Sequence, residues 1–468
     1  MKAFKCPHCG GDVHYDVGKE SVTCEFCGST ISRAEYQQFL DENNMLVSNE
    51  LVCPQCGGTL LSYDDTIATF CNYCGSPVTF NKRIREETKP DGIIPFKIKK
   101  DAAAVKYREM VSKSLFAPDW MADPGQMHMT GIYMPFYSYS AKTSGSFKCP
   151  GTKKIEYPNK TIYEDYKVDF SLAAEYDGTR FDASASFPDS MSESIDDYNL
   201  NVVPFETSYT AGFYADGGNV DEEEYDGVVS TLVRGDLFSG QNVANGISLK
   251  TNNLNPEIEI DNKKFLLPVW LCTHKVGDRI CYAAINGQTG KAAADIPIDK
   301  SKYWKTAIVA TAIIATFLNL FFTLPVRVLL IVSAIIAIMF SIFLSGLLTD
   351  IEIRKLGYDD IGRNGYDKFK KVARAGSSTG GMQSQKVGHL NWTFTAVKAA
   401  VHTGPLILLL VISIFMIIFK LPWDTLYYLI AVGYIIYAFV AAFRVIDKQN
   451  ELASREIPVF TMKRGGDK

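Results

Sequence analysis

Eight of the eleven cysteines in this chain stand in Cys-x-x-Cys pairs, and the pairs form two groups. The first group is Cys6, Cys9, Cys24 and Cys27, and the second is Cys53, Cys56, Cys71 and Cys74. In both groups fourteen residues separate the two pairs, and the whole pattern recurs after 47 residues. A glycine follows every pair, which suits a tight turn that aims two thiolates at one ion.

This spacing predicts two zinc ribbons, each closed around one ion by four sulfurs. A four-sulfur shell leaves no position open for water, so the two predicted Zn²⁺ ions are structural rather than catalytic. Unligated structural cysteines or a redox pair are the alternative, but four pairs in a repeated frame argue against it. His8 lies inside the first turn and is expected to be exposed, because the cysteines already complete the shell.

The N-terminus bears on the state of these thiols. Met1 is followed closely by the first cysteine pair, with no apolar signal segment between them. We therefore expect the N-terminal part to stay in the cytoplasm, where thiols remain reduced and serve as metal ligands more often than as disulfides.

Charge is distributed unevenly and separates the chain into three parts. Residues 1–89 hold 8 Lys/Arg against 12 Asp/Glu, residues 90–300 hold 21 against 30, and residues 301–468 hold 19 against 10. Nucleic-acid binding relies on Lys and Arg that neutralise phosphates, so the acidic ribbons argue against it. Docking to a protein partner is the favoured use of the ribbons, and a membrane-tethered nucleic-acid-binding regulator is the alternative.

The first 82 residues divide into ribbon 1 (1–32), a helical spacer (33–50) and ribbon 2 (51–82). Ser32 followed by Glu35 is a capping-box pattern, which predicts that a short helix begins after Ser32.

Residues 90–300 are predicted to form an α+β domain with an antiparallel sheet. Turn residues and apolar runs indicate several strands: Gly131–Ser140, Tyr163–Ala174, Val202–Phe205, Phe265–Lys275 and Arg279–Asn286. Helix-like spacing predicts three helices: Lys100–Leu115, Asp221–Val233 and Ser239–Val243.

The sequence contains none of the common catalytic motifs, so we predict that the protein is not an enzyme. It has no metalloprotease, nucleophile-elbow or phosphate-binding-loop motif. Cys272, His274 and Cys281 lie in neighbouring predicted strands, where a third metal site is conceivable, but buried thiols and a satisfied histidine are favoured. Cys149 has no obvious partner.

Uncharged apolar stretches in the last third predict a four-helix transmembrane region. The predicted spans are Thr306–Thr323, Val328–Leu348, Gly404–Phe419 and Thr425–Phe443. They make two hairpins, 303–348 and 397–443, joined by a basic loop (349–396) and followed by a tail (444–468). A buried hairpin in a soluble core is the alternative. Because Lys and Arg gather in the loop and at the outer ends, both termini are expected in the cytoplasm.

The phrases Val202-Val-Pro-Phe205, Leu266-Leu-Pro-Val-Trp-Leu271 and Ile285-Asn-Gly-Gln-Thr-Gly-Lys291, after tandem ribbons and before apolar helices, resemble a bacterial family. These are the membrane-associated TFIIB-type zinc-ribbon proteins, often mislabelled as primosomal helicase-like. The resemblance implies rubredoxin-like ribbons and a scaffold or anchor for phage-shock-type or SPFH-type membrane proteins, in envelope stress or membrane organisation.

The expected function is therefore that of a non-enzymatic, zinc-binding membrane scaffold that contacts lipid and docks cytoplasmic proteins. A transporter or membrane enzyme is disfavoured, since no charged side chain lies within the predicted spans. The sequence leaves self-association open.

Overall fold

The computed structural model of this chain describes residues 2–42, 66–70, 77–79, 90–356, 392–419 and 423–454. Short gaps within the fourth range fall at 125–126, 159, 185–186, 188, 200, 219, 240–242, 245–246, 252–253, 277–278 and 322–324. Several predictions lie outside the described residues: Cys53, Cys56, Cys71 and Cys74 of ribbon 2, the last part of the helical spacer, most of the basic loop and the end of the tail.

Ribbon 1 is a small antiparallel sheet followed by a helix. Its three strands are β2 (Val13–Asp16), β3 (Ser21–Cys24) and β4 (Thr30–Ser32), in the order β2-β3-β4. Helix α1 (Arg33–Glu42) starts at the predicted capping box. The Ser32 hydroxyl donates to Glu35 Oε2 at 2.8 Å, and the Glu35 amide donates to the Ser32 hydroxyl at 3.3 Å.

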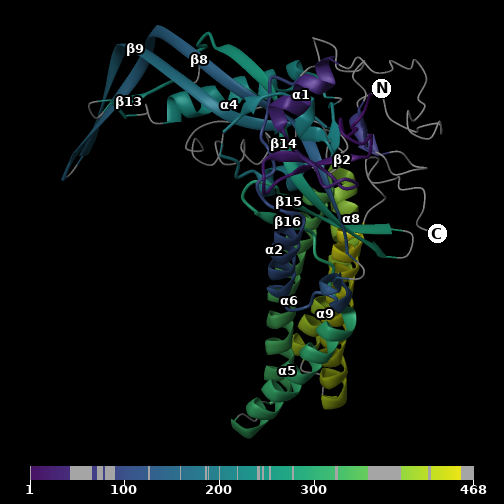
Figure 1. Cartoon of the computed structure of the whole chain (residues 1–468). Helices are drawn as coiled ribbons and strands as arrows, with labels where there is room; N and C mark the ends of the chain where they lie inside the picture. The colour runs from purple at the N-terminus through teal and green to yellow at the C-terminus, as the bar shows by residue number, and fades with distance from the viewer. Residues whose placement is uncertain are drawn as a thin grey trace.

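The body of the protein is a large, curled sheet that is mostly antiparallel (Figure 1). Its long strands are β8 (His128–Tyr157), β9 (Lys160–Asp182), β14 (Glu259–Val276) and β15 (Arg279–Asn286), with β16 (Ala292–Ala294) at one edge. β8 lies between β9 and β14, and β14 continues to β15. The predicted strands of this region are present, but β8 and β9 extend far beyond them and make a long hairpin.

Short strands complete the sheet: β1 (Lys2–Ala3), β5 (Thr66–Phe70), β6 (Pro77–Thr79), β7 (Gly92–Ile93), β10 (Val203–Pro204), β11 (Tyr214–Asp216), β12 (Val243–Ala244) and β13 (Ile247–Leu249). β5 and β6 come from the segment of ribbon 2. β5 pairs with β11 of the body, and β6 pairs with β1 from the N-terminus. The backbone of both cysteine-rich segments is therefore joined to the same sheet.

Three helices cover the sheet: α2 (Lys100–Ser112), α3 (Asp189–Ile195) and α4 (Asp226–Ser239). Each has its own apolar contacts with the sheet. Tyr107 of α2 packs in one cluster with Trp270, Met191 of α3 packs in a second with Leu267, and Val229 of α4 packs in a third with Phe181. Most of the helix predicted over Ser239–Val243 lies outside the described residues, while Ser239 belongs to α4 and Val243 to β12.

Four further helices form a bundle on the side of the sheet away from the tip of the β8–β9 hairpin (Figure 1). They are α5 (Lys300–Phe321), α6 (Val326–Leu356), α8 (Trp392–Ile418) and α9 (Asp424–Ala453). α6 and α9 run side by side in the same direction. The first halves of both meet in one apolar cluster and the second halves in another, and the Ser341 and Tyr437 hydroxyls hydrogen-bond at 2.9 Å between them.

The predicted four-helix transmembrane region is wrong. Among the described residues only two stretches are long and apolar enough to cross a membrane, Val326–Ile351 in α6 and all of α9. α5 begins with Lys300, Lys302 and Lys305, and the remaining turns reach roughly 24 Å at 1.5 Å per residue. The described apolar part of α8, Gly404–Ile418, is shorter still. Neither matches the roughly 30 Å of hydrocarbon that a span must cross.

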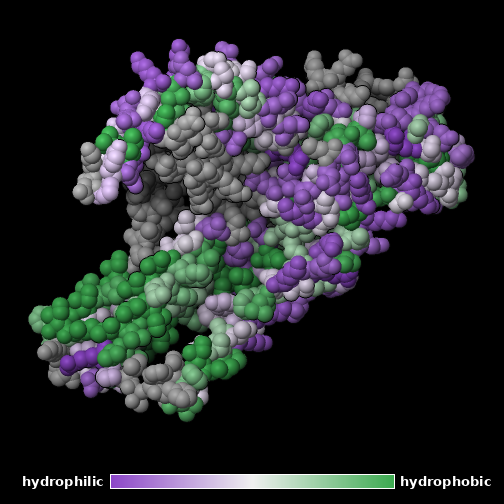
Figure 2. All heavy atoms as spheres, turned by 90° about the vertical axis from the view of Figure 1, so that its left-hand side faces the viewer, coloured by the Kyte–Doolittle hydropathy of each residue, from purple (hydrophilic) through white to green (hydrophobic). Residues whose placement is uncertain are grey.

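The bundle carries its apolar side chains on the outside. Ile336 and Met339 of α6 and Ile435 of α9 are more than 60% exposed. Figure 2 shows the resulting hydrophobic surface over the helices, in contrast to the hydrophilic surface of the sheet. Such a large apolar patch marks an interaction surface rather than a water-facing one, so the two apolar helices suggest association with a membrane.

Candidate metal centre

The two Cys-x-x-Cys turns of ribbon 1 have the same backbone hydrogen bonds. The Cys6 amide donates to the Gly11 carbonyl at 2.8 Å, and the Cys24 amide donates to the Ser29 carbonyl at 2.9 Å. Gly10 donates back to Cys6, and Gly28 back to Cys24, at 2.9 and 3.0 Å. Both of these glycines have φ near +72°, a conformation that other residues rarely adopt. The repeated Cys-x-x-Cys-Gly pattern therefore encodes one turn used twice.

The two turns face each other and bring all four sulfurs together. The Sγ atoms of Cys6, Cys9, Cys24 and Cys27 lie within 4.8 Å of one another. Cys6 Sγ is 3.7 Å from Cys27 Sγ, and Cys9 Sγ is 3.6 Å from Cys24 Sγ. Four sulfurs at about 2.3 Å from a central Zn²⁺ would be about 3.8 Å apart in a tetrahedron. The group is thus compatible with a metal ion, as the sequence predicted for these four residues.

Hydrogen bonds around the sulfurs favour thiolates at some positions and not at others. The Ser29 hydroxyl lies 3.0 Å from Cys27 Sγ, and its hydrogen bond is the main reason why the pKa of Cys27 falls to about 6. Gly11 donates to Cys9 Sγ at 3.4 Å, but burial and the three neighbouring sulfurs outweigh this bond and raise the pKa of Cys9 to about 12. Several negative charges so close together oppose one another, and a central cation removes that conflict.

The outer surface of the centre is exposed. His8 and Phe26 each occupy the third position of a Cys-x-x-Cys turn, and both are exposed, as predicted for His8. Phe26 is 84% exposed. Cys6 and Cys24 are buried beneath the turns, so the ribbon presents an aromatic ring and an imidazole above a closed sulfur cluster.

Ribbon 1 packs against the segment of the body that ends at β11. Tyr15 donates its amide to the Ala211 carbonyl at 2.9 Å, and its ring meets that of Tyr209 edge to face at 5.4 Å. Arg33 of α1 forms an ion pair with Glu206, and its guanidinium lies 4.7 Å from the centre of the Tyr209 ring. Phe4 and Tyr36 of the ribbon share one apolar cluster with Phe205.

No sequence motif predicts this contact surface. Glu206 and Tyr209 follow the phrase Val202-Val-Pro-Phe205 but belong to no motif themselves. Cys6 and Cys24 lie in the same apolar cluster as Phe205 and Tyr209, so the metal centre and the body share one core.

The remaining candidate cysteines do not join this centre. Cys272 and Cys281 are buried on β14 and β15, where His274 stands directly opposite Cys281. The Tyr107 hydroxyl and His274 Nε2 are 2.8 Å apart, which gives the buried imidazole a hydrogen-bond partner. Burial alone raises the pKa of Cys272 to about 12 and disfavours its thiolate. This arrangement fits the favoured interpretation for the two thiols, which are buried, and it gives His274 a hydrogen bond at Nε2.

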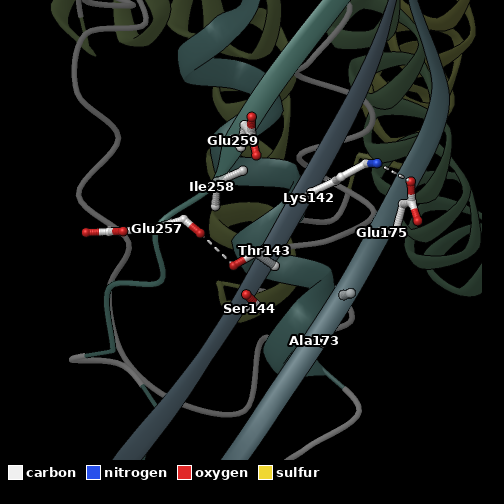
Figure 3. A pocket seen from close by; sticks show the side chains of 9 residues that line it. Lys142, Thr143, Ser144, Ala173, Glu175, Glu257, Ile258 and Glu259 are labelled. Atoms are coloured by element: carbon white, nitrogen blue, oxygen red, sulfur yellow. Dashed lines mark hydrogen bonds and ion pairs between the residues drawn. The ribbon is translucent and has the colours of Figure 1, made fainter.

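An open hollow of about 720 Å³ lies where the β8–β9 hairpin leaves the body (Figure 3). Two pairs of polar groups on its wall contact each other. Lys142 Nζ lies 2.9 Å from Glu175 Oε1, and the Thr143 hydroxyl donates to the Glu257 carbonyl at 2.7 Å. The hollow therefore has the character of a solvated groove between strands.

Comparison with known proteins gives one relative of unassigned function. The chain is 29% identical over 316 residues to the uncharacterized protein YdjG of Bacillus subtilis strain 168. The aligned region covers 64% of this chain and 91% of that protein. No family model matches the chain. No solved structure matches it either. A role must therefore be argued from the residues themselves.

Proposed function

We propose that this protein is a non-enzymatic, zinc-binding membrane scaffold that holds cytoplasmic proteins at the membrane. The observation that carries the proposal is the joining of a closed four-sulfur centre to a helical bundle with an apolar outer surface, through one sheet. The first feature favours protein docking over catalysis, and the second favours lipid as the environment of α6 and α9.

Zinc is the proposed metal because four thiolates in a tetrahedral arrangement are its usual structural site. The second cysteine group repeats the spacing of the first, and its last pair falls between the paired strands β5 and β6. We therefore propose two structural ions in each chain.

The contacts at the top of the bundle support a location of the sheet and the end of α9 on the same side of the membrane. Asn450 Nδ2 donates to the Ile298 carbonyl at 3.0 Å, the Ile298 amide donates to Asn450 Oδ1 at 2.7 Å, and Lys300 pairs with Asp447 at 2.5 Å. A chain whose thiols serve as metal ligands belongs on the reducing side. We place both parts in the cytoplasm.

The exposed ring of Phe26 is the proposed docking residue of ribbon 1, since exposed aromatic side chains are common anchors at interfaces. The proposed partner is a membrane-associated cytoplasmic protein of the phage-shock or SPFH type. Acidic ribbons are poorly suited to nucleic acid.

Co-purification tests this function. The full-length protein, Phe26→Ala and the matched control Leu115→Ala are extracted from membranes in mild detergent, and the bound proteins are quantified by mass spectrometry. Leu115 is 76% exposed and lies in the body. A specific protein retained by wild type and Leu115→Ala but lost from Phe26→Ala, at equal metal content, is expected. Equal profiles for all three would contradict docking by ribbon 1.

Membrane attachment is tested separately. Alkaline carbonate is expected to leave the protein in the membrane pellet, and protease is expected to cleave the sheet domain in inside-out but not in right-side-out vesicles. Release by carbonate would contradict the role given to α6 and α9.

A further inference from the structure

The β8–β9 hairpin continues beyond the sheet body as an arm, residues 142–157 of β8 and 160–177 of β9 (Figure 1). β14 stops pairing with β8 at Lys142, and farther out the three residues of β13 pair with Gly151–Lys153. A two-stranded sheet is only marginally stable in water and gains stability from further strands. The arm therefore lacks, over most of its length, the neighbours that hold the rest of the sheet.

The two faces of the arm differ in polarity. One face carries apolar side chains, and the rings of Phe147 and Phe170 meet across the strands in a tilted arrangement with 5.8 Å between their centroids. The other face is polar: Lys148 pairs with Asp169 at 3.4 Å, and the Thr152 hydroxyl donates to Asp165 at 2.9 Å. Any strand added to the arm must keep apolar with apolar and polar with polar.

The outer edge of β9 is the open edge of the arm. Within the described part of the chain β9 pairs with β8 alone. Residues 160–177 thus offer about 60 Å of strand with outward backbone groups. Charged residues normally protect such an edge from foreign strands. Here, however, the edge carries charges of both signs, with Lys167 between Asp165 and Asp169.

We propose that a second copy of this chain pairs with this edge, β9 against β9 and antiparallel, to form one continuous sheet through two arms. A twofold axis perpendicular to the sheet brings the same edge of both copies together and keeps each face on its own side. The residue on that axis is then opposite itself. Lys167, Asp165 or Asp169 in this position would place like charges together, which disfavours those registers.

The register centred on Val168 satisfies both faces. On the polar face it sets Lys167 of each copy opposite Asp169 of the other, so that two ion pairs form. On the apolar face it sets Tyr166 opposite Phe170, also twice. Lys167 makes no ion pair with a described residue of its own chain, so this charge is available. Aromatic pairs and opposite charges are the cross-strand pairs that stabilise sheets.

Charge reversal and charge exchange test the proposal in full-length protein in detergent, with mass measured by light scattering. Wild type is expected at twice the protomer mass, Lys167→Glu at the protomer mass, and the exchange Lys167→Glu with Asp169→Lys again at twice the mass. Lys154→Glu, on β8, is the control and is expected to leave the doubled mass unchanged. Three results would each overturn the proposal: a wild type at the protomer mass, a Lys167→Glu variant at twice that mass, or an exchange variant at the protomer mass.

A second measurement does not depend on these substitutions. A photoreactive phenylalanine derivative in place of Tyr166 is expected to cross-link two copies, with the bond mapped by mass spectrometry to the peptide that contains Phe170. Cross-links confined to other segments, or none between copies, would overturn the proposal. Either failure leaves metal content and membrane attachment unchanged, so it is distinguishable from a failure of the proposed scaffold function.

Discussion

Ribbon 1 and the helical bundle are attached to the same sheet, but they differ in the exposure of their apolar side chains. The ribbon buries nearly all of the few it has, among them Phe4, Val22 and Tyr36, and closes around four sulfurs. The bundle exposes most of its apolar residues, and Ile336 and Ile435 face outward. The ribbon has too small a core to be stable alone, and the bundle has too much apolar surface for water.

In the proposed function, each region is completed by a component outside the polypeptide. A metal ion would stabilise the ribbon, whose core is small, and lipid would cover the apolar surface of the bundle. The contacts with the body include the ion pair of Arg33 with Glu206 on the ribbon side and that of Lys302 with Asp119 on the bundle side. The following predictions test whether the two regions differ in this way.

The largest effect is expected from Cys24→Ser, which removes one buried metal ligand. Structural zinc supplies about 10–16 kcal/mol of apparent binding free energy in small zinc domains, so its loss should unfold the ribbon. Hydrogen exchange followed by mass spectrometry should show fast exchange in β2, β3 and β4. Cys149→Ser, a buried cysteine on the arm, is the control and should leave these strands protected. Protected strands in Cys24→Ser would contradict a metal-held ribbon.

A charge on the outer face of the bundle should have the next largest effect. Ile336→Lys places an ammonium group in the middle of α6, where insertion into lipid costs about 2.5–3.5 kcal/mol. The matched control is Leu115→Lys, because Leu115 is 76% exposed on the body, and surface changes there cost about 0.5 kcal/mol or less. Yield in the membrane fraction and thermal stability in detergent are the readouts. Equal behaviour of the two variants would show that water covers both sites.

Metal affinity should rise with pH, whereas the bundle offers no comparable effect. The pKa of Cys9 is raised to about 12, so near neutral pH the metal must displace its proton, and metal affinity should increase at least tenfold per pH unit. The pKa of Cys27 is lowered to about 6, so this thiol adds a further proton only below that pH, where metal affinity should fall more steeply.

Competition with a chromophoric chelator between pH 5 and pH 8 measures this slope. Ser29→Ala removes the hydroxyl that lowers the pKa of Cys27. The steeper part of the curve should therefore begin at higher pH in this variant. A pH-independent affinity would contradict thiolate ligation.

The smallest effects are expected at the two attachments. Arg33→Ala removes both the ion pair with Glu206 and the contact with the Tyr209 ring, with a loss of about 1–2 kcal/mol. Lys302→Ala breaks the more exposed pair between α5 and Asp119 of the body, with a loss of about 0–1 kcal/mol. Chemical unfolding of the detergent-solubilised protein compares them. A larger loss for Lys302→Ala would reverse the order of the two attachments.

The sequence allowed some features to be predicted because their chemistry is local. The Cys-x-x-Cys-Gly turns of ribbon 1, the capping box at Ser32 and the strand Arg279–Asn286 are set by neighbouring residues, and the structure confirms them. The sequence did not predict the arm because the length of a strand depends on its partner. The alternation of side chains in β8 beyond Ser140 is stabilised as a strand only when β9 pairs with it.

The prediction of four spans failed for a related reason. Lack of charge was used as the criterion, but the apolar turns that remain in α5 and in the described part of α8 are too short for a bilayer. The docking of ribbon 1 on Tyr209 joins residues distant in the chain, and no local pattern indicates such a contact. The second cysteine group stays a prediction.

The number and ligands of the bound metal ions can be measured on the purified full-length protein by metal analysis combined with X-ray absorption. We expect two zinc ions in each chain, each surrounded by four sulfurs at about 2.3 Å, and one ion in the Cys24→Ser variant. Less than one zinc ion in the wild type, or a shell of nitrogen and oxygen ligands, would contradict this expectation.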